Sequence, residues 1–285
     1  MRQTAPNAHA AVVPFSKMEG LGNDFMVVDA RGFSFDPPGA RVRALADRRT
    51  GVGFDQLLVL EDPGTDDAAF AYRIWNADGE AVAQCGNGAR CLAWLWAREL
   101  SPGAGRFVMA SPAGPVEATV EDGRVSVCMG EPAFDPARVP MKATSEAARY
   151  TIDVQGNPVE LGAVSMGNPH AVIVVDDVAA APVATLGPAV ESHPAFPERV
   201  NVGFVQQLDS GHLALRVHER GCGETRACGT GACAAAAVLR DRGQTDPGVD
   251  VDLPGGRLRI RWEGRGHALW MSGPARKVFE GSVEA

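Results

Sequence analysis

The sequence predicts an α+β protein of two pseudo-symmetric lobes, each with a curved, mostly antiparallel sheet around a central helix. Short β-like runs between turn signals dominate both halves of the 285-residue chain, and each half holds one long helix-like run. The segments Cys85-Gly86-Asn87-Gly88 and Cys228-Gly229-Thr230-Gly231 stand directly before those two runs. The two halves therefore repeat one plan, and we expect the lobes at residues 1–129 with 274–285 and at residues 130–273.

In the first half, two helices are expected. One covers residues 38–49 and stops at Gly51, and the other begins near Asn87 with an apolar face that includes Cys91 and Leu95. The Asp-Gly pairs in residues 77–79 and 121–123 are typical of hairpin turns. Between these signals we expect strands at residues 25–29, 56–60, 70–75, 107–110, 116–120 and 124–129.

The second half has the same kinds of segment. An Ala-rich helix is expected over residues 231–241, and its small side chains suit a position deep inside a narrow sheet. The Pro-rich residues 130–140 are the expected crossover between the lobes. Strands are expected at residues 150–154, 159–165, 171–175, 202–206, 213–218, 249–253, 258–262 and 268–271, with a final strand near Lys277.

Charge and hydropathy narrow the classes of partner. The net charge of −8 argues against nucleic acid or an anionic membrane as a partner. No apolar stretch reaches the about 20 residues that a membrane-spanning helix needs. Residues 1–14 lack the continuous apolar segment of a secretory signal, so we interpret them as a loose tail. The expected location is the cytoplasm.

The six cysteines include no Cys-x-x-Cys pair, which disfavours a zinc site or a thioredoxin-like redox site. Cys91 and Cys233 lie in apolar helical runs and are expected in the core. Cys128 alternates with valines in a strand-like run, which also indicates packing. Cys222 lies in a Gly-rich loop and receives no role. We expect no metal site.

Cys85 and Cys228 differ from the other four because each is followed at once by a helix start. The free N–H groups and positive dipole end of a helix start stabilise a thiolate and lower its pKa, and they also bind carboxylates. If the two starts face each other, one thiolate can remove the hydrogen beside a bound carboxylate, and the other thiol can return one from the opposite side. This chemistry inverts a stereocentre without a cofactor. The alternative is two Gly-rich helix caps with incidental cysteines, which their matched positions disfavour.

Further segments, in order along the chain, extend this interpretation. Together with Cys85-Gly86-Asn87-Gly88-Ala89-Arg90-Cys91 they resemble the diaminopimelate epimerase family, whose enzymes work without pyridoxal phosphate. The matching segments are residues 17–25, 53–58, 75–79, 85–91, 167–170, 199–202 and 218–231. The resemblance implies interconversion of LL- and meso-diaminopimelate, in lysine and peptidoglycan precursor synthesis. The expected partner is a small-molecule amino-acid substrate, and a homodimer is also expected.

The resemblance also implies residue roles. Cys85 and Cys228 would be the acid and base, with His170 and Glu219 beside them. Donors to the carboxylate at the reacting carbon would come from Gly86, Asn87, Gly229 and Thr230. The rest of the substrate would be held by Asn23, Gln56, Asn76, Asn168, Asn201, Glu219 and Arg220.

Simple chemistry supports part of this set and leaves alternatives open. The planar guanidinium of Arg220 suits a second carboxylate, and Glu219 suits an ammonium group. Taken alone, Asn76 and Asn168 are also typical turn residues, and His170 is typical of a hydrogen-bonded core histidine. Asp24 and Asp55 are expected to form caps or turns.

Two rival functions remain at this stage. A proline or hydroxyproline racemase-like enzyme would share the fold and the paired thiols, but a cyclic imino acid has no second carboxylate for Arg220 to bind. A cysteine-based redox or metal-binding protein is the rival from another class, and the cysteine spacing speaks against it.

Overall fold

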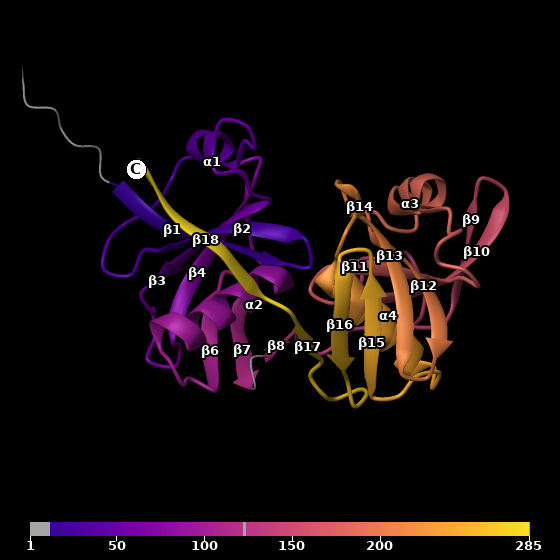
Figure 1. Cartoon of the computed structure of the whole chain (residues 1–285). Coiled ribbons are helices and arrows are strands. Elements are labelled where there is room, and N and C mark those ends of the chain that lie inside the picture. The colour runs from indigo at the N-terminus through magenta and orange to yellow at the C-terminus, as the bar shows by residue number, and fades with distance from the viewer. Residues whose placement is uncertain (1–11, 122–123, 285) are drawn as a thin grey trace, which may run out of the picture.

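The structure is a computed structural model that describes residues 12–121 and 124–284. Figure 1 shows two lobes side by side, and in each lobe a helix lies against a curved sheet. The last strand, β18 (Arg276–Glu284), returns across the first lobe. The predicted α+β fold with two similar lobes is confirmed.

The N-terminal lobe contains two α-helices, a π-helical turn and most of the early strands. Its elements are β1 (Val12–Gly20), β2 (Asn23–Asp29), α1 (Gly39–Ala46), β3 (Gln56–Glu61), β4 (Phe70–Asn76), β5 (Ala81–Val82), α2 (Gly86–Leu95), η1 (Trp96–Leu100), β6 (Arg106–Ser111), β7 (Gly114–Glu121) and β8 (Arg124–Cys128), together with β18.

The C-terminal lobe repeats this arrangement. Its elements are β9 (Tyr150–Val154), β10 (Asn157–Ser165), β11 (Pro169–Val174), α3 (Val183–Glu191), β12 (Asn201–Asp209), β13 (His212–Glu219), β14 (Gly223–Thr225), α4 (Gly229–Asp241), β15 (Gly248–Leu253), β16 (Gly256–Arg261) and β17 (Trp270–Gly273).

The strand pairing demonstrates the repeat. Most neighbours are antiparallel, but β2 pairs in parallel with β3, and β4 with β6. The equivalent strands of the other lobe do the same, because β11 is parallel to β12 and β13 is parallel to β15. A short antiparallel strand completes each set, β5 on β4 and β14 on β13. Two lobes with the same unusual pairings support an internal duplication.

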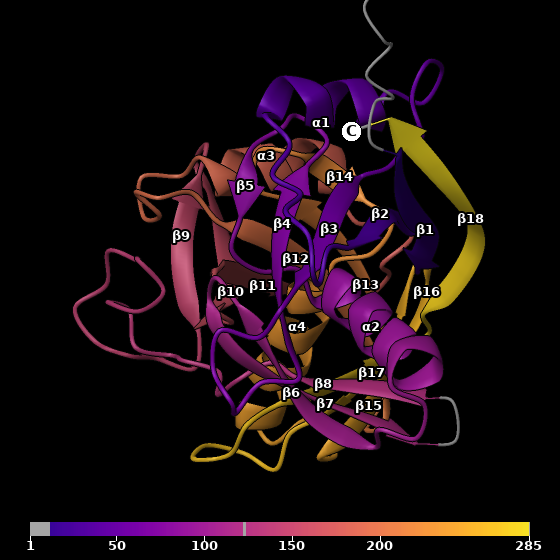
Figure 2. The same cartoon turned by 90° about the vertical axis from the view of Figure 1, so that its left-hand side faces the viewer.

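The lobes share a sheet and a core. Strand β17 pairs with β8 across the boundary, and the hydroxyl oxygens of Ser126 and Ser272 lie 2.6 Å apart on those strands. Figure 2 shows α2 and α4 one behind the other, and the two helices contact each other. The alanines of α4 between residues 234 and 237 are buried, so this helix packs closely against strands on several sides.

Several predicted boundaries need correction. Helix α1 is shorter than residues 38–49 because Asp47 accepts hydrogen bonds from the backbone of Arg49 and Thr50 and so forms a turn. Both central helices begin slightly earlier than predicted, at Gly86 and Gly229. The predicted tail is wrong at its end, since residues 12–14 belong to β1, while residues 1–11 lie outside the described residues.

The remaining differences are small. The predicted turn at residues 121–123 falls largely outside the described residues, although β7 and β8 pair on either side of it. Residues 130–140 hold no helix or strand beyond one bridge from Ala133 to Ser165. Helix α3, strand β1 and the short strands β5 and β14 were not predicted. None of the described helices is long and apolar enough to cross a membrane.

Candidate active site

Cys85 is the N-cap residue of α2. Its backbone is extended, with φ −149° and ψ 110°, and its sulfur accepts a hydrogen bond from the N–H of Gly88 at 3.4 Å. The glycines at 86 and 88 keep this first turn free of side chains, and both are buried. A thiol with helix N–H donors beside it is what the sequence predicted here.

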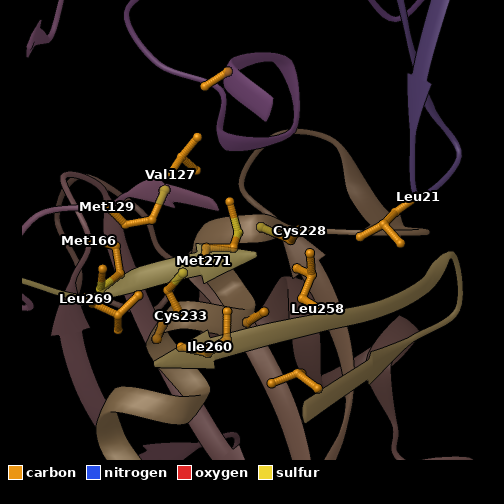
Figure 3. Packing of buried hydrophobic residues seen from close by; sticks show 14 of the residues in the cluster. Leu21, Val127, Met129, Met166, Cys228, Cys233, Leu258, Ile260, Leu269 and Met271 are labelled. Atoms are coloured by element: carbon orange, nitrogen blue, oxygen red, sulfur yellow. The ribbon is translucent and has the colours of Figure 1, made fainter. Parts of the chain in front are cut away.

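Cys228 occupies the same position on α4, with φ −111° and ψ 107°. Its sulfur lies 3.6 Å from the hydroxyl oxygen of Thr230 and is buried. In Figure 3 the side chain of Cys228 lies beside Met271 within the core that both lobes share. The two predicted thiols therefore have matching backbone positions but different immediate partners.

The first turns of α2 and α4 meet at the boundary between the lobes. The side-chain amide of Asn87 donates to the carbonyl of Ala227, the residue before Cys228, at 3.4 Å. Met271 on β17 packs against both turns. A Cβ added to Gly86 would lie 2.7 Å from the Cε of Met271, and a Cβ added to Gly229 would lie 3.1 Å from its sulfur. The structure thus brings Gly86, Asn87 and Gly229 together as predicted.

The net effect on the thiol pKa differs from the prediction. Burial raises the pKa of Cys85, although the N–H groups of Gly88 and Asn87 and the charge of Arg90 act against it. Burial, followed by the charge of Glu219, raises the pKa of Cys228 well above its usual value. The predicted lowering by the helix start is therefore wrong in sum, because desolvation of a buried thiolate outweighs the donors.

Glu219 lies near both thiols. It ends β13 and accepts a hydrogen bond from the hydroxyl of Thr225 on β14. Its negative charge contributes to the raised pKa of Cys85 as well as that of Cys228. Glu219 is therefore the acidic group that the two predicted acid/base residues share.

His170 and Asn168 connect to the start of α4 through a chain of hydrogen bonds. Asn168 donates to the hydroxyl of Thr230 at 3.4 Å, and the ring Nε2 of His170 lies 3.0 Å from the side-chain oxygen of Asn168. Burial, with a smaller contribution from the charge of Arg220, lowers the pKa of His170 to about 3. The imidazole is therefore neutral near pH 7, so it donates a hydrogen bond to Asn168 and orients this side chain.

Asn201 joins the strand that carries His170 to the backbone of Arg220. Asn201 lies opposite His170 on paired parallel strands, donates to the carbonyl of Pro169 at 2.9 Å and accepts from the backbone N–H of Arg220 at 3.0 Å. The guanidinium of Arg220 donates to the carbonyl of Glu198 at 2.9 Å. These contacts fix the segment that carries Glu219 and Arg220 beside His170.

The N-terminal lobe contributes the other predicted amides. Gln56 donates to Asn76 at 2.8 Å across β3 and β4, and the buried oxygen of Gln56 has no protein partner among the described residues. Asn23 donates to Asp55 at 2.9 Å. Asp55 and Asp24 also bind Arg48, and each accepts the backbone N–H of the other, so they join β2 to the segment before β3 rather than forming the expected caps or turns.

Cys222 lies in the loop between β13, which ends at Glu219, and β14. After burial, the charges of Glu219 and Asp78 are the largest influences that raise the pKa of Cys222. Asp78 belongs to the turn that follows Asn76.

Sequence reasoning missed Arg90, Met271 and Thr225. A lone arginine in the otherwise small and apolar start of α2 was the available signal for Arg90. Nothing in the local sequence marks Met271 or Thr225. Among the residues described, no group of three metal-binding side chains comes together. A groove of about 950 Å³ elsewhere, beside Trp270 and Arg259, contains none of the predicted site residues.

Comparisons with known proteins agree with this geometry. The sequence pattern of the diaminopimelate epimerase family matches residues 15–134 and 162–278. A diaminopimelate epimerase of Alkalilimnicola ehrlichii is 54% identical over 275 residues, which cover 95% of this chain and 98% of that protein. One of Nitrosomonas europaea is 52% identical over 273 residues, covering 95% and 98% of the two chains.

Solved structures share the fold at low sequence identity. A hydroxyproline epimerase from Agrobacterium vitis, with bound trans-4-hydroxy-L-proline, matches with a TM-score of 0.68 at 16% identity, over 95% of this chain and 92% of that one. A PhzF-family phenazine biosynthesis protein from Bacillus anthracis matches with a TM-score of 0.66 at 16% identity, over 96% and 99%. Because the duplicated fold, the paired helix-start thiols and the near-complete relatives agree, this chain belongs to the diaminopimelate epimerase family.

Proposed function

We propose that the protein interconverts LL- and meso-diaminopimelate, and that it does so with Cys85 and Cys228 as acid and base and without a cofactor. The observation that supports this best is the position of each thiol at the start of a central helix, with the two first turns in contact through Asn87 and Ala227. Relatives at 54% and 52% identity bear the name diaminopimelate epimerase.

The reaction needs only proton transfers. One thiolate takes the α-hydrogen as a proton, and the electron pair of the broken C–H bond delocalises onto the neighbouring carboxylate. N–H groups of the helix starts at Gly86, Asn87, Gly229 and Thr230 stabilise this charge. The other thiol gives its proton to the opposite face of the carbon, so the two sulfurs exchange protonation states in each turnover.

Burial of the two thiols helps the difficult first step. A raised pKa makes the thiolate, once formed, a stronger base, and the α-hydrogen of an amino acid is a very weak acid. Neutral His170 orients Asn168 and thereby Thr230, and Glu219 adds a negative charge beside both sulfurs. We propose that these two residues tune the thiols rather than carry the proton.

The far end of the substrate would be held by an asymmetric set of side chains. Arg220 suits the second carboxylate, Glu219 the second ammonium, and the amides Asn23, Gln56, Asn76, Asn168 and Asn201 can donate and accept at once. The buried, unpartnered oxygen of Gln56 fits a role as acceptor from a bound ammonium group.

We also propose a division into lobes at residues 1–129 with 274–285 and residues 130–273, a cytoplasmic location and a homodimer. The exposed apolar side chains of Val12, Val278 and Phe279 lie on the paired strands β1 and β18 and suit a contact with a second copy.

The direct test is to incubate the protein with LL-diaminopimelate and to follow the meso isomer by chiral chromatography. We expect meso-diaminopimelate to form to an equilibrium mixture without added cofactor, and L-proline and trans-4-hydroxy-L-proline to remain unchanged. Inversion of either imino acid, with diaminopimelate untouched, would favour the racemase that shares this fold.

A further inference from the structure

Arg90 is fully buried in the centre of the molecule, one turn beyond Cys85 on α2. Its Nη2 donates to the side-chain oxygen of Asn87 at 2.9 Å, and its Nη1 lies 3.5 Å from the sulfur of Met271. Its Nε has no partner among the described residues. A buried guanidinium with so few partners is costly, so it is rarely kept for stability alone.

The surroundings leave space for this side chain. A Cβ added to Gly273 would lie 3.1 Å from the Nε of Arg90, and one added to Gly20 would lie 3.6 Å from its Nη2. The two glycines come from β17 and β1, on opposite sides of the lobe boundary. The guanidinium therefore packs against backbone from both lobes.

Through its two contacts Arg90 reaches both helix starts. Asn87, which it holds, donates onward to the carbonyl of Ala227 beside Cys228. Met271, which it also contacts, packs against Gly86 and Gly229. A small displacement of the guanidinium would move the two first turns relative to each other.

We propose that Arg90 is a positioning residue that holds the starts of α2 and α4 in register through Asn87 and Met271, and that its positive charge supports a thiolate at Cys85. The kinetic part of this proposal rests on the proposed function. The electrostatic part concerns the free protein and stands without it.

Burial lowers the pKa of Arg90, but a guanidinium gives up its proton only far above physiological pH, so Arg90 keeps its charge. Its charge acts to lower the pKa of Cys85, Cys91 and Cys233 against the effect of burial. Burial nevertheless raises the pKa of Cys233 to about 12 and that of Cys91 further. Cys85 also receives backbone N–H groups from both Asn87 and Gly88, whereas Cys233 receives only its own. The other ionisable groups that act on these thiols are Glu19, Glu219 and Tyr72.

The test uses Arg90→Met, which removes the charge with little change of volume, and Arg90→Lys, which keeps the charge but loses the planar fork. Both are made in a Cys222→Ser background because Cys222 is exposed and would react. Arg242→Met is the control, since Arg242 is a partly buried arginine whose pKa is also lowered by burial and which lies at the far end of α4. Iodoacetamide labelling of Cys85 is followed by peptide mass spectrometry from pH 7 to 11.5, without substrate.

We expect Arg90→Met to move the labelling midpoint of Cys85 upward by about one pH unit or more, and Arg242→Met to leave it in place. Arg90→Lys should keep the midpoint within about 0.5 unit but lower kcat for diaminopimelate on the order of tenfold to a hundredfold, with a smaller change in KM. An unchanged midpoint in folded Arg90→Met would overturn the electrostatic role.

Wild-type kcat in Arg90→Lys would overturn the positioning role. If Arg90→Met does not fold, as judged by circular dichroism, the Lys variant still decides that point. If the unmodified enzyme itself does not act on diaminopimelate, the proposed function fails, whereas the labelling midpoints still test the charge of Arg90.

Discussion

Cys85 and Cys228 are both N-cap residues in extended conformation, and the helices they start touch at their first turns. Their partners differ, because Cys85 accepts from the N–H of Gly88 whereas Cys228 lies beside the hydroxyl of Thr230. The fold therefore presents two equivalent sulfurs in unequal surroundings. This inequality suits an enzyme that must tell two faces of one carbon apart.

Replacing Arg220 by Ala should reduce kcat/KM for diaminopimelate on the order of a hundredfold, because a substrate carboxylate would lose a charge-assisted partner. The control is Arg199→Ala, since Arg199 is more than half exposed and its guanidinium bonds Glu191. Steady-state kinetics of both variants check this. Equal kcat/KM for Arg220→Ala and the unmodified enzyme would show that Arg220 does not bind the far carboxylate.

His170 should make stability depend on pH. Its pKa is lowered to about 3 in the folded protein and returns to about 6.5 on unfolding, so between these values only the unfolded chain binds the proton. Stability therefore falls as pH decreases below 6.5, with this group contributing up to about 1.4 kcal/mol per pH unit.

Urea unfolding of His170→Gln at pH 7 and pH 5 measures this contribution. On acidification the variant should lose less free energy of unfolding than the unmodified protein. The difference should match the effect of one proton that only the unfolded chain binds. His267→Gln, at an exposed position, should behave like the unmodified protein. Parallel pH profiles for all three proteins would contradict a neutral, buried His170.

The sequence predicted most of the fold because short strands between turn signals are local features. These local features were enough to predict most strands in their order along the chain, and the two central helices. Helix α3 escaped prediction because Gly187 and Pro188 lie within it, and both residues disfavour a helix interior. Strand β1 was not predicted, because its first residues were interpreted as a tail and its partners β18 and β2 lie in other segments of the chain.

The site was predicted in part, for a similar reason. Residue types at helix starts made Cys85 and Cys228 candidates from local pattern alone, and the structure places both at helix N-caps. Arg90 and Met271 act through contacts between segments 181 positions apart, which no local pattern contains. The sign of the thiol pKa shift also depends on burial by the other lobe, and so the helix start alone gave the wrong direction.

Gly255 is a contact point between the lobes. A Cβ there would lie 2.0 Å from the carbonyl oxygen of Leu21 and 3.0 Å from that of Arg226. We expect Gly255→Ala to lower the free energy of unfolding by about 1–3 kcal/mol, because the clash can be relieved only by moving backbone atoms. Gly64→Ala is the control, since its Cβ would meet nothing within 4 Å. Urea unfolding of both variants makes the comparison, and equal stability would refute the contact.

Phe279 should contribute to a dimer. It is 48% exposed on β18 and stacks edge-on with Phe15 of β1, with ring centres 6.1 Å apart. Phe279→Glu should shift the protein toward monomer in sedimentation velocity runs. Leu208→Glu is the matched control, because Leu208 is also 48% exposed but lies in the other lobe. A monomeric unmodified protein at micromolar concentration would reject the dimer.

The most direct measurement of the two-thiol account is epimerisation of LL-diaminopimelate in deuterium oxide by the unmodified protein, Cys85→Ser and Cys228→Ser, followed by mass spectrometry and chiral chromatography. The unmodified protein should place deuterium on the inverted carbon. Each serine variant should lose epimerisation by about a thousandfold or more, because a hydroxyl is too weak an acid and its alkoxide too rare a base. Cys222→Ser, at an exposed cysteine, should retain full rate. Epimerisation at the unmodified rate in either Cys85→Ser or Cys228→Ser would contradict the account.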